Sequence, residues 1–232
     1  MLERLLLLTG SFEAGILAPH LVKQNPDCAV RPVDSRDKLE EALAEPAGPT
    51  RLLAFCTSVI VPQRVLAALP GPSYNIHPGP PSFPGRHPES WGAYQGLASF
   101  GSTLHEMAPR VDEGRIIDVS WFEPPPGAGQ LEFGYGAFRA ALQLILRWAA
   151  ALAGDERPLP HSEHRWSGRK TTHADLEAMC RIGPEIDATE FERRRRAFAE
   201  QPGSRMSLLL HGREFHYVAP QLPRIEITPV TA

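Results

Sequence analysis

The sequence predicts an α/β protein whose mainly parallel β-sheet is covered by helices on both faces, followed by a small C-terminal α+β extension. Short apolar runs alternate with stretches of helical spacing from Arg4 to Ile76, which is typical of βαβ units. Beyond Gly154 the chain becomes irregular and then shows a hairpin pattern. With 232 residues the chain can form one full domain and a small second one, so we expect a core over residues 1–154 and an extension over residues 155–232.

The expected strands are short apolar runs bounded by glycine, proline or polar residues. Two of them, RLLLLT and RLLAFCT, are apolar at every position between the first arginine and the last threonine, which indicates strands buried on both faces. Ligands of such sheets bind at the carboxyl ends of strands, so we expect the site in the loops after Thr9, Thr57 and Ile76. The expected strands are Arg4–Thr9, Ala29–Val33, Arg51–Thr57, Tyr74–Ile76, Gly101–Met107 and Ile116–Phe122.

The expected helices of the core lie between these strands and after the last one. Ser35 is a suitable N-cap for the second helix, and proline lies in the first turn of the third. In the fourth and longest helix we expect one apolar side, with Phe138, Leu142, Ile145 and Leu146, to face the core. The four helices are Phe12–Val22, Ser35–Glu45, Pro62–Leu69 and Leu131–Leu152.

The extension begins with an irregular stretch, Arg157–Lys170, and continues with helices and a hairpin. Its basic run, Arg193–Arg196, is expected on a solvated helix face. The hairpin offers an edge strand for pairing with a second copy, so a homodimer is one expected state. The expected elements are helices Ala174–Arg181 and Thr189–Glu200, hairpin strands Ser207–Leu210 and Glu214–Val218, and a third strand Arg224–Ile227.

Composition excludes several classes of function. The formal net charge is −3, so no general basic field is available for nucleic-acid binding. The three cysteines, Cys28, Cys56 and Cys180, are far apart, which argues against a disulfide framework and favours a reducing compartment. The Leu5–Leu8 run is too short for a membrane span or a signal peptide. We therefore expect a cytoplasmic protein that does not bind membranes.

Common nucleotide, hydrolase and metal motifs are missing. The first turn, TGSFEAG, lacks both GxGxxG and the P-loop lysine, and no GxSxG segment occurs. His161, His164 and His173 lie near one another in the sequence, but no carboxylate or thiol completes a zinc spacing. We therefore expect no metal.

The segment YNIHPGPPSFPG carries the candidate chemistry. Asn75 and His77 project on one face of an expected strand, just before a proline-rich loop. Asp112 lies in a loop between two later strands. An amide, an imidazole and a carboxylate could stabilise a tetrahedral intermediate and move protons. The alternative is structural: Asn75 and His77 satisfy loop backbone, and Asp112 makes an Asx turn.

Four segments, NIHP, WGAYQG, GSTLHEM and VDEGRII, follow one another in this order between Asn75 and Ile117. This order resembles the folate-dependent formyltransferase family, which includes the glycinamide ribonucleotide, methionyl-tRNA and sugar-nucleotide N-formyltransferases. The family pattern is Asn-x-His-Pro-Ser, a Leu-Leu-Pro loop, x-Gly-x-Thr-x-His and Asp-x-Gly. The resemblance covers Arg51–Pro124 well and Arg4–Val22 loosely, and it implies a Rossmann-like formyltransferase core.

The resemblance implies a catalytic triad and a formyl donor, 10-formyltetrahydrofolate. Asn75 would donate a hydrogen bond to the formyl oxygen, and His77 would stabilise the oxyanion and relay protons. Asp112 would orient His77 and assist removal of a proton from the attacking amine. The pterin would lie between the Cys56–Pro62 and Ala108–Gly114 loops. The residues expected to bind or support the folate are Cys56, Ser58, Ile60, Pro62, Thr103, His105, Val111, Glu113 and Gly114.

The acceptor is left open, because Gly-Pro-Pro-Ser replaces the family's Ser-Leu-Leu-Pro beside the histidine. A small-molecule amine is the leading expectation, on an amino sugar nucleotide or an amino-acid or peptide derivative. A methionyl-tRNA enzyme is disfavoured by the acidic charge and the short extension. The motifs are also compatible with a formyltetrahydrofolate hydrolase and with a non-catalytic folate-binding module. The expected acceptor-binding residues are Pro80, Pro81, Arg86, Trp166 and Arg169.

Overall fold

A six-stranded sheet forms the centre of the computed structural model, which describes residues 2–154, 157–200 and 206–218. The strand order is β2-β1-β3-β4-β5-β6; the first four strands are parallel, and β5 runs antiparallel to both of its neighbours, β4 and β6. The predicted mainly parallel α/β sheet is therefore confirmed. The strands are β1 (Arg4–Leu8), β2 (Ala29–Val33), β3 (Thr50–Phe55), β4 (Tyr74–His77), β5 (Phe100–Glu106) and β6 (Ile116–Phe122).

Helices cover both faces of the sheet because side chains of β1 alternate between two apolar clusters. Leu5 and Leu7 pack in the cluster that contains α1 (Ser11–Gln24) and α5 (Gln130–Gly154). Leu6 and Leu8 pack in the opposite cluster, with residues of two further helices. All four leucines are fully buried. The helices on the second face are α2 (Arg36–Ala44), with its N-cap Ser35 as predicted, and α3 (Gln63–Ala68).

Helix α5 buries most of the side that we expected: Ile145 is fully buried, and Phe138 and Leu142 pack against the same apolar cluster. Leu146 is 62% exposed, so its assignment to the core is wrong. The buried side also carries small residues, including Ala137 and Ala141, together with Leu144 and Ile145. Alanines allow the helix backbone to approach the sheet closely.

Arg51 on β3 ties the end of α5 to the sheet. Its guanidinium donates to the carbonyl oxygens of Ala151, Leu152 and Arg157, each at 2.8 Å, and lies over the ring of Tyr74. Arg51 is only 2% exposed. A cation at the C-terminus of a helix satisfies carbonyl groups that have no partner within the helix.

Helix α4 (Pro88–Gln95) was not expected from the sequence. Its buried residues include Ser90, Gly92 and Ala93, so it lacks an apolar stripe at helical spacing. Gly92 is needed for packing, because a Cβ there would lie 2.7 Å from the ring of Phe100 and 2.8 Å from that of Phe133.

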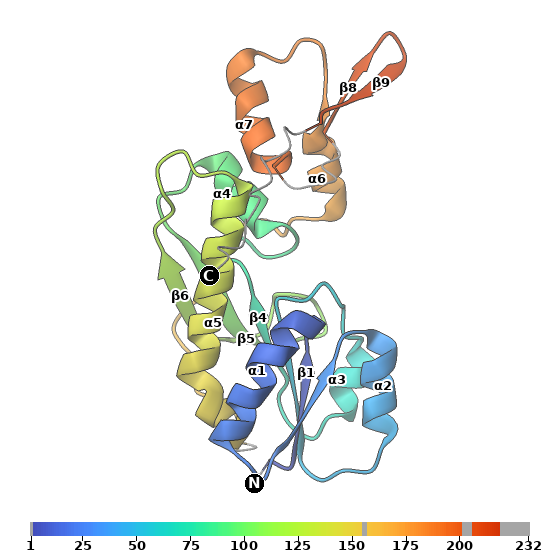
Figure 1. Ribbon diagram of the computed structural model, residues 1–232, viewed down its shortest axis with the longest axis vertical. Coiled ribbons are helices and arrows are strands. Elements are labelled where there is room, and N and C mark those ends of the chain that lie inside the picture. The colour runs from blue at the N-terminus through green and yellow to red at the C-terminus, as the bar shows by residue number, and fades with distance from the viewer. Residues whose placement is uncertain (1, 155–156, 201–205, 219–232) are drawn as a thin grey trace, which may run out of the picture.

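The extension packs on α4 at one end of the molecule (Figure 1). Phe198 and Ala197 join an apolar cluster with Phe83, Phe100 and Phe133 of the core. The strand Arg224–Ile227 lies outside the described residues, and the homodimer stays a prediction. The elements are α6 (His173–Cys180), β7 (Arg181–Ile182), α7 (Ala188–Phe198), β8 (Ser207–Leu210) and β9 (Arg213–His216), with β9 at the edge of a three-stranded sheet.

The basic run on α7 does not form the solvated face that we expected. Arg193 stacks on the ring of Tyr94 at 3.9 Å and donates to the Tyr94 carbonyl oxygen. Arg194 donates to Glu190 at 2.7 Å and to the Met179 carbonyl oxygen at 3.3 Å. These arginines are only half-exposed and fasten α7 to α4 and α6. In the described part of the chain, no helix combines the length and hydrophobicity that a membrane span requires.

Candidate active site

A cavity of about 450 Å³ opens at the carboxyl ends of β3 and β4. Its walls come from the loop after β3, the loop after β4, the β5–β6 loop and residues 170–173 of the extension. The loop after Thr9, which we also expected to contribute, provides none of the lining residues in the described part of the chain. The expected site residues that line the cavity are Cys56, Ser58, Ile60, Asn75, His77, Arg86, His105, Val111 and Asp112.

The antiparallel pairing of β4 with β5 brings together residues that are far apart in the sequence. Asn75 pairs with His105, and His77 pairs with Thr103. The Oγ1 of Thr103 donates to the Gly79 carbonyl oxygen at 2.8 Å and so holds the turn that follows His77. Thr103 is fully buried and supports the site without lining the cavity.

His105 is fixed at both ring nitrogens. Its Nδ1 lies 2.7 Å from the Glu106 carbonyl oxygen, and because a carbonyl only accepts, this nitrogen carries a proton. Its Nε2 lies 3.0 Å from Nδ2 of Asn75, which donates to it when the ring is neutral. An amide nitrogen has two hydrogens, so Asn75 retains a second one for a ligand.

His77 is held by the proline-rich loop. Its Nε2 donates to the Phe83 carbonyl oxygen at 2.9 Å, and its Nδ1 lies 3.7 Å from Oδ2 of Asp112. The second distance exceeds that of a hydrogen bond. The Phe83 carbonyl, more directly than Asp112, therefore sets the orientation of this ring.

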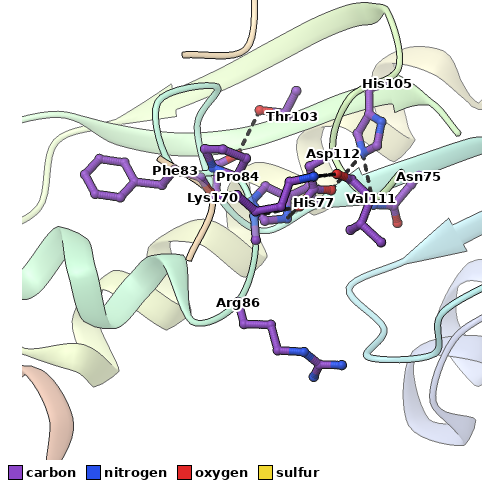
Figure 2. A network of polar contacts seen from close by, with 12 residues as sticks. Asn75, His77, Phe83, Pro84, Arg86, Thr103, His105, Val111, Asp112 and Lys170 are labelled. Atoms are coloured by element: carbon purple, nitrogen blue, oxygen red, sulfur yellow. Dashed lines mark hydrogen bonds and ion pairs between the residues drawn. The ribbon is translucent and has the colours of Figure 1, made fainter. Parts of the chain in front are cut away.

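Asp112 lies between the two imidazoles (Figure 2). Its backbone is in the left-handed region, with φ of 51°, and its side chain is 2% exposed. The Gly85 N–H donates to Oδ2 at 2.8 Å. Gly85 has φ of 101°, a conformation that favours glycine, and it directs this N–H at the carboxylate.

Burial and neighbouring charges determine the protonation of this cluster. Burial alone would raise the pKa of Asp112, but the charges of His77 and His105 and the hydrogen bond from the Gly85 N–H lower that pKa to about 2. Burial lowers the pKa of His77, and the charge of Asp112 opposes this effect only in part. Near neutral pH the cluster therefore holds an ionised carboxylate beside a neutral His77.

This arrangement can accept a proton and stabilise negative charge on oxygen. The amide of Asn75 can donate to a developing oxyanion, and the ionised Asp112 can receive a proton from an attacking amine. Both histidines turn their second nitrogen to Asp112, so a proton that reaches either ring remains next to the carboxylate.

Several expected folate-binding residues lie outside the cavity wall. Pro62 is the N-cap of α3. Glu113 forms ion pairs with Lys170 at 3.0 Å and with Arg110 at 2.7 Å. The carbonyl oxygen of Gly114 accepts a hydrogen bond from the Trp166 indole at 2.7 Å.

Most of the expected acceptor-binding residues also lie outside the cavity wall. The carbonyl oxygens of Pro80 and Pro81 accept hydrogen bonds from Phe83 and from the extension. Arg169 is exposed and pairs with Asp175. Trp166 packs behind His77 and His105. Arg86 alone of this group lines the cavity, and Figure 2 shows its side chain extending away from the histidine cluster.

Sequence reasoning placed the extension at the site through Trp166 and Arg169, but other residues of the extension line the cavity. Lys170, Thr171 and His173 line it, and Gly85 forms an isolated β-bridge with Thr171. His87, another lining residue, lies 5.9 Å from His173 between ring centres. No local sequence pattern signals these contacts, because they depend on how the extension folds back over the core.

The cavity suits a flat heteroaromatic ligand better than a metal. Val59, Ile60, Val61 and Met107 provide apolar walls. Oδ1 of Asp112 is buried and accepts no hydrogen bond from any described residue, so a polar edge of a ligand can pair with it. In the described chain, no group of three or more His, Cys, Asp or Glu residues is placed to hold a metal ion.

Comparison with known proteins agrees with this architecture. Residues 18–123 match the family model for formyl transferase. A sugar N-formyltransferase from Shewanella is 14% identical with a TM-score of 0.74, covering 97% of this chain and 100% of its own. A 4-N formyltransferase from Francisella tularensis is 16% identical with a TM-score of 0.70, covering 96% and 99%.

A third structure carries ligands. The N-formyltransferase from Helicobacter canadensis, solved with folinic acid and dTDP-3-aminofucose, is 16% identical with a TM-score of 0.58, covering 85% of this chain and 81% of its own. At these identities the three structures establish a common fold. The matched residues 18–123 include Asn75, His77 and Asp112. This segment is thus similar to the formyl transferase family, and the chain shares its fold with the three structures.

Proposed function

We propose that the protein transfers a formyl group from 10-formyltetrahydrofolate to the amine of a small-molecule acceptor, on an amino sugar nucleotide or an amino-acid or peptide derivative. The observation that carries this proposal is the buried Asp112, which faces His77 and His105 at 3.7 and 3.5 Å beside the Asn75 amide in one cavity. The fold and the family match support the reaction class.

The residues act on the two centres where charge changes. When a neutral amine attacks the formyl carbon, negative charge develops on oxygen and positive charge on nitrogen. Asn75 donates to the oxygen, and Asp112 with the two imidazoles receives the proton that the amine loses. The bond from the formyl carbon to the folate nitrogen then breaks, and the cluster returns one proton to that nitrogen. The donor supplies the formyl carbon, and no net proton is gained or lost.

The two substrates would enter from different sides of the cavity. The apolar loop after β3 and Val111 suit the pterin of the folate. Arg86 is exposed at the cavity wall, which suits an anionic group of the acceptor, such as a phosphate or a carboxylate. The ligands of the Helicobacter canadensis enzyme, folinic acid and an amino sugar nucleotide, match this pair of chemical classes.

The first experiment is thermal unfolding with and without excess 5-formyltetrahydrofolate, a stable analogue of the donor. Ligand at about a hundred times its Kd adds about 2.7 kcal/mol of stability, which raises the Tm by roughly 5–10 °C at this chain length. No shift in a well-folded sample would contradict folate binding. The same measurement on Asp112→Asn tests how much of the Tm shift depends on the carboxylate.

The second experiment separates transfer from hydrolysis. Amino sugar nucleotides and amino acids are supplied with 10-formyltetrahydrofolate, and both tetrahydrofolate and formate are measured. Tetrahydrofolate that appears only with an amine supports the transferase. Formate released without an amine supports the hydrolase, and folate binding without turnover on any amine supports a binding module.

A further inference from the structure

Trp166 lies outside the family-matched segment and yet touches both histidines of the site. Its ring centre is 5.8 Å from that of His77 and 5.0 Å from that of His105, and both contacts are edge-on. Its indole N–H donates to the Gly114 carbonyl oxygen at 2.7 Å, in the loop that carries Asp112. Trp166 is half-buried and does not line the cavity, so it lies behind the histidines.

The segment around Trp166, residues 161–172, which we call the strap, is bonded to the proline-rich loop on one side of the site. The Ser167 N–H donates to the Pro81 carbonyl oxygen at 2.9 Å. Thr171 accepts from the Arg86 N–H at 3.0 Å and donates to the Pro84 carbonyl oxygen at the same distance. The strap therefore has a fixed path beside His77.

The strap is also bonded to the Asp112 loop on the other side. Lys170 donates to the Val111 carbonyl oxygen and to Glu113. Ser162 donates to the Ile116 carbonyl oxygen at 2.9 Å through its N–H. The strap thus links the loop after β4 with the β5–β6 loop, and Trp166 is the side chain that fills the space between them at the histidines.

We propose that Trp166 is a positioning residue that holds the imidazoles of His77 and His105 against Asp112 and excludes water from their rear side. The consequence for turnover rests on the proposed function, whereas the placement of the rings does not. One ring nitrogen of each histidine donates to a backbone carbonyl oxygen. The other nitrogen lies farther from Asp112 than an ordinary hydrogen bond allows. His105 is also held by Asn75 at its second nitrogen. Packing by the indole is a further constraint on both rings, and it matters most for His77, whose second nitrogen faces only Asp112 at 3.7 Å.

Truncation of the indole should change how His77 binds protons. The charged and titratable groups that act on His77 are Asp112, His105 and Glu89, and none of them changes in a Trp166 variant. Burial is the largest cause that lowers the pKa of His77. Water admitted behind the ring should therefore move that pKa up toward the ordinary histidine value.

The test compares Trp166→Ala and Trp166→Phe with the matched control Trp148→Ala. Trp148 is also half-buried and donates its indole N–H to a side chain, Asp118 at 2.8 Å, but it lies on α5 and packs against the apolar core rather than against the two histidines. The readouts are the titration of the histidine C2–H signals by NMR, assigned with His77→Gln and His105→Gln, and kcat and KM for both substrates.

We expect Trp166→Ala to raise the titration midpoint of His77 and to lower kcat about tenfold or more, with KM for the folate within threefold, because small misplacements of reacting groups are costly. Trp166→Phe retains a ring and should remain within about threefold of wild type. Trp148→Ala should lower the Tm and leave both histidine titrations unchanged.

An unchanged His77 titration in a folded Trp166→Ala protein would overturn the proposal, as would an equal change in Trp148→Ala. A kcat within twofold of wild type in Trp166→Ala would also overturn it. Should the wild-type protein transfer no formyl group, the proposed function fails, whereas the two titrations still decide whether Trp166 positions the rings.

Discussion

Oδ1 of Asp112 lies 3.5 Å from Nε2 of His105, and it accepts no hydrogen bond from any residue in the described ranges. The other oxygen, Oδ2, accepts the Gly85 N–H at 2.8 Å. A buried carboxylate oxygen without a donor is unfavourable in isolation. Its position on the cavity wall beside an imidazole therefore indicates a role in binding a ligand or receiving a proton.

Asp112→Asn should remove most formyl transfer without unfolding the protein. Asparagine has nearly the same shape and can still accept from the Gly85 N–H, but it cannot take a proton from an amine. Loss of general-base assistance typically costs 10²–10⁴-fold, so we expect kcat to fall at least about a hundredfold. Steady-state kinetics with a saturating amine checks this, and near-UV circular dichroism confirms folding. A loss below about fivefold would remove Asp112 from proton transfer.

The ionised Asp112 should also make the stability of the protein depend on acid pH. Its pKa of about 2 in the folded protein lies below the ordinary aspartate value of 3.8, so as the pH falls the unfolded chain binds this proton first. The stabilisation is therefore complete above pH 4 and is lost between about pH 4 and pH 2. Its size is about 2 kcal/mol.

Urea unfolding of wild type and Asp112→Asn between pH 5 and pH 2 measures this effect. As the pH falls over this range, the free energy of unfolding of the wild type should drop by about 2 kcal/mol relative to that of Asp112→Asn. A constant difference over this range would mean that the carboxylate is not stabilised in the folded protein.

The sequence predicted most of the sheet because the strands are short, apolar and separated by clear turn signals. Arg4–Leu8 and Thr50–Phe55 match buried runs to within two residues at each end. Helix α4 was missed because its buried positions, such as Ser90 and Gly92, are small and not periodic in hydrophobicity. Leu146 was misassigned for the opposite reason, since a large apolar side chain on α5 faces solvent.

The order of motifs in the sequence pointed to Asn75, His77 and Asp112, and the structure brings them to one cavity. Their roles in the reaction stay predictions. What the sequence did not predict is tertiary: the pairing of Asn75 with His105 joins residues 30 positions apart. The contact of Trp166 with both histidines joins a segment that follows α5 in the sequence to two strands that precede it. No local pattern encodes either contact.

Arg51→Met should destabilise the protein strongly. The substitution retains an apolar stem but removes the Arg51 donor from two carbonyl oxygens at the end of α5 and from that of Arg157 beyond it. Hydrogen bonds to charged groups contribute about 1.5–3 kcal/mol each, and partial compensation by water leads us to expect a loss of about 3 kcal/mol in total. Urea unfolding measures it.

The matched control is Arg64→Met, which removes an exposed ion pair with Glu40. Such pairs contribute about 0–1 kcal/mol, so the control should remain close to wild type. Equal losses in the two variants would show that Arg51 contributes nothing beyond an ordinary surface arginine.

Arg86→Ala should weaken binding of an anionic acceptor and leave folate binding intact. Arg86 lines the cavity on the proline-rich loop, and its exposed guanidinium is available for a phosphate or carboxylate. We expect KM for an anionic acceptor to rise about tenfold, with kcat and the KM for folate within threefold. The control is Arg110→Ala, an exposed arginine paired with Glu113 on the Asp112 loop. An unchanged acceptor KM in Arg86→Ala would exclude this residue from acceptor binding.

Asn75→Ala should reduce kcat by about 10²–10³-fold, because one preorganised donor to an oxyanion contributes about 2.7–4 kcal/mol to the transition state. The Nδ2 of Asn75 donates to His105 at 3.0 Å, so truncation also frees one nitrogen of that ring. His105→Gln separates the two effects: a large loss in Asn75→Ala with a small loss in His105→Gln assigns the effect to the oxyanion. Steady-state and single-turnover formyl transfer measure both variants. A rate within threefold of wild type in Asn75→Ala would remove the amide from the mechanism.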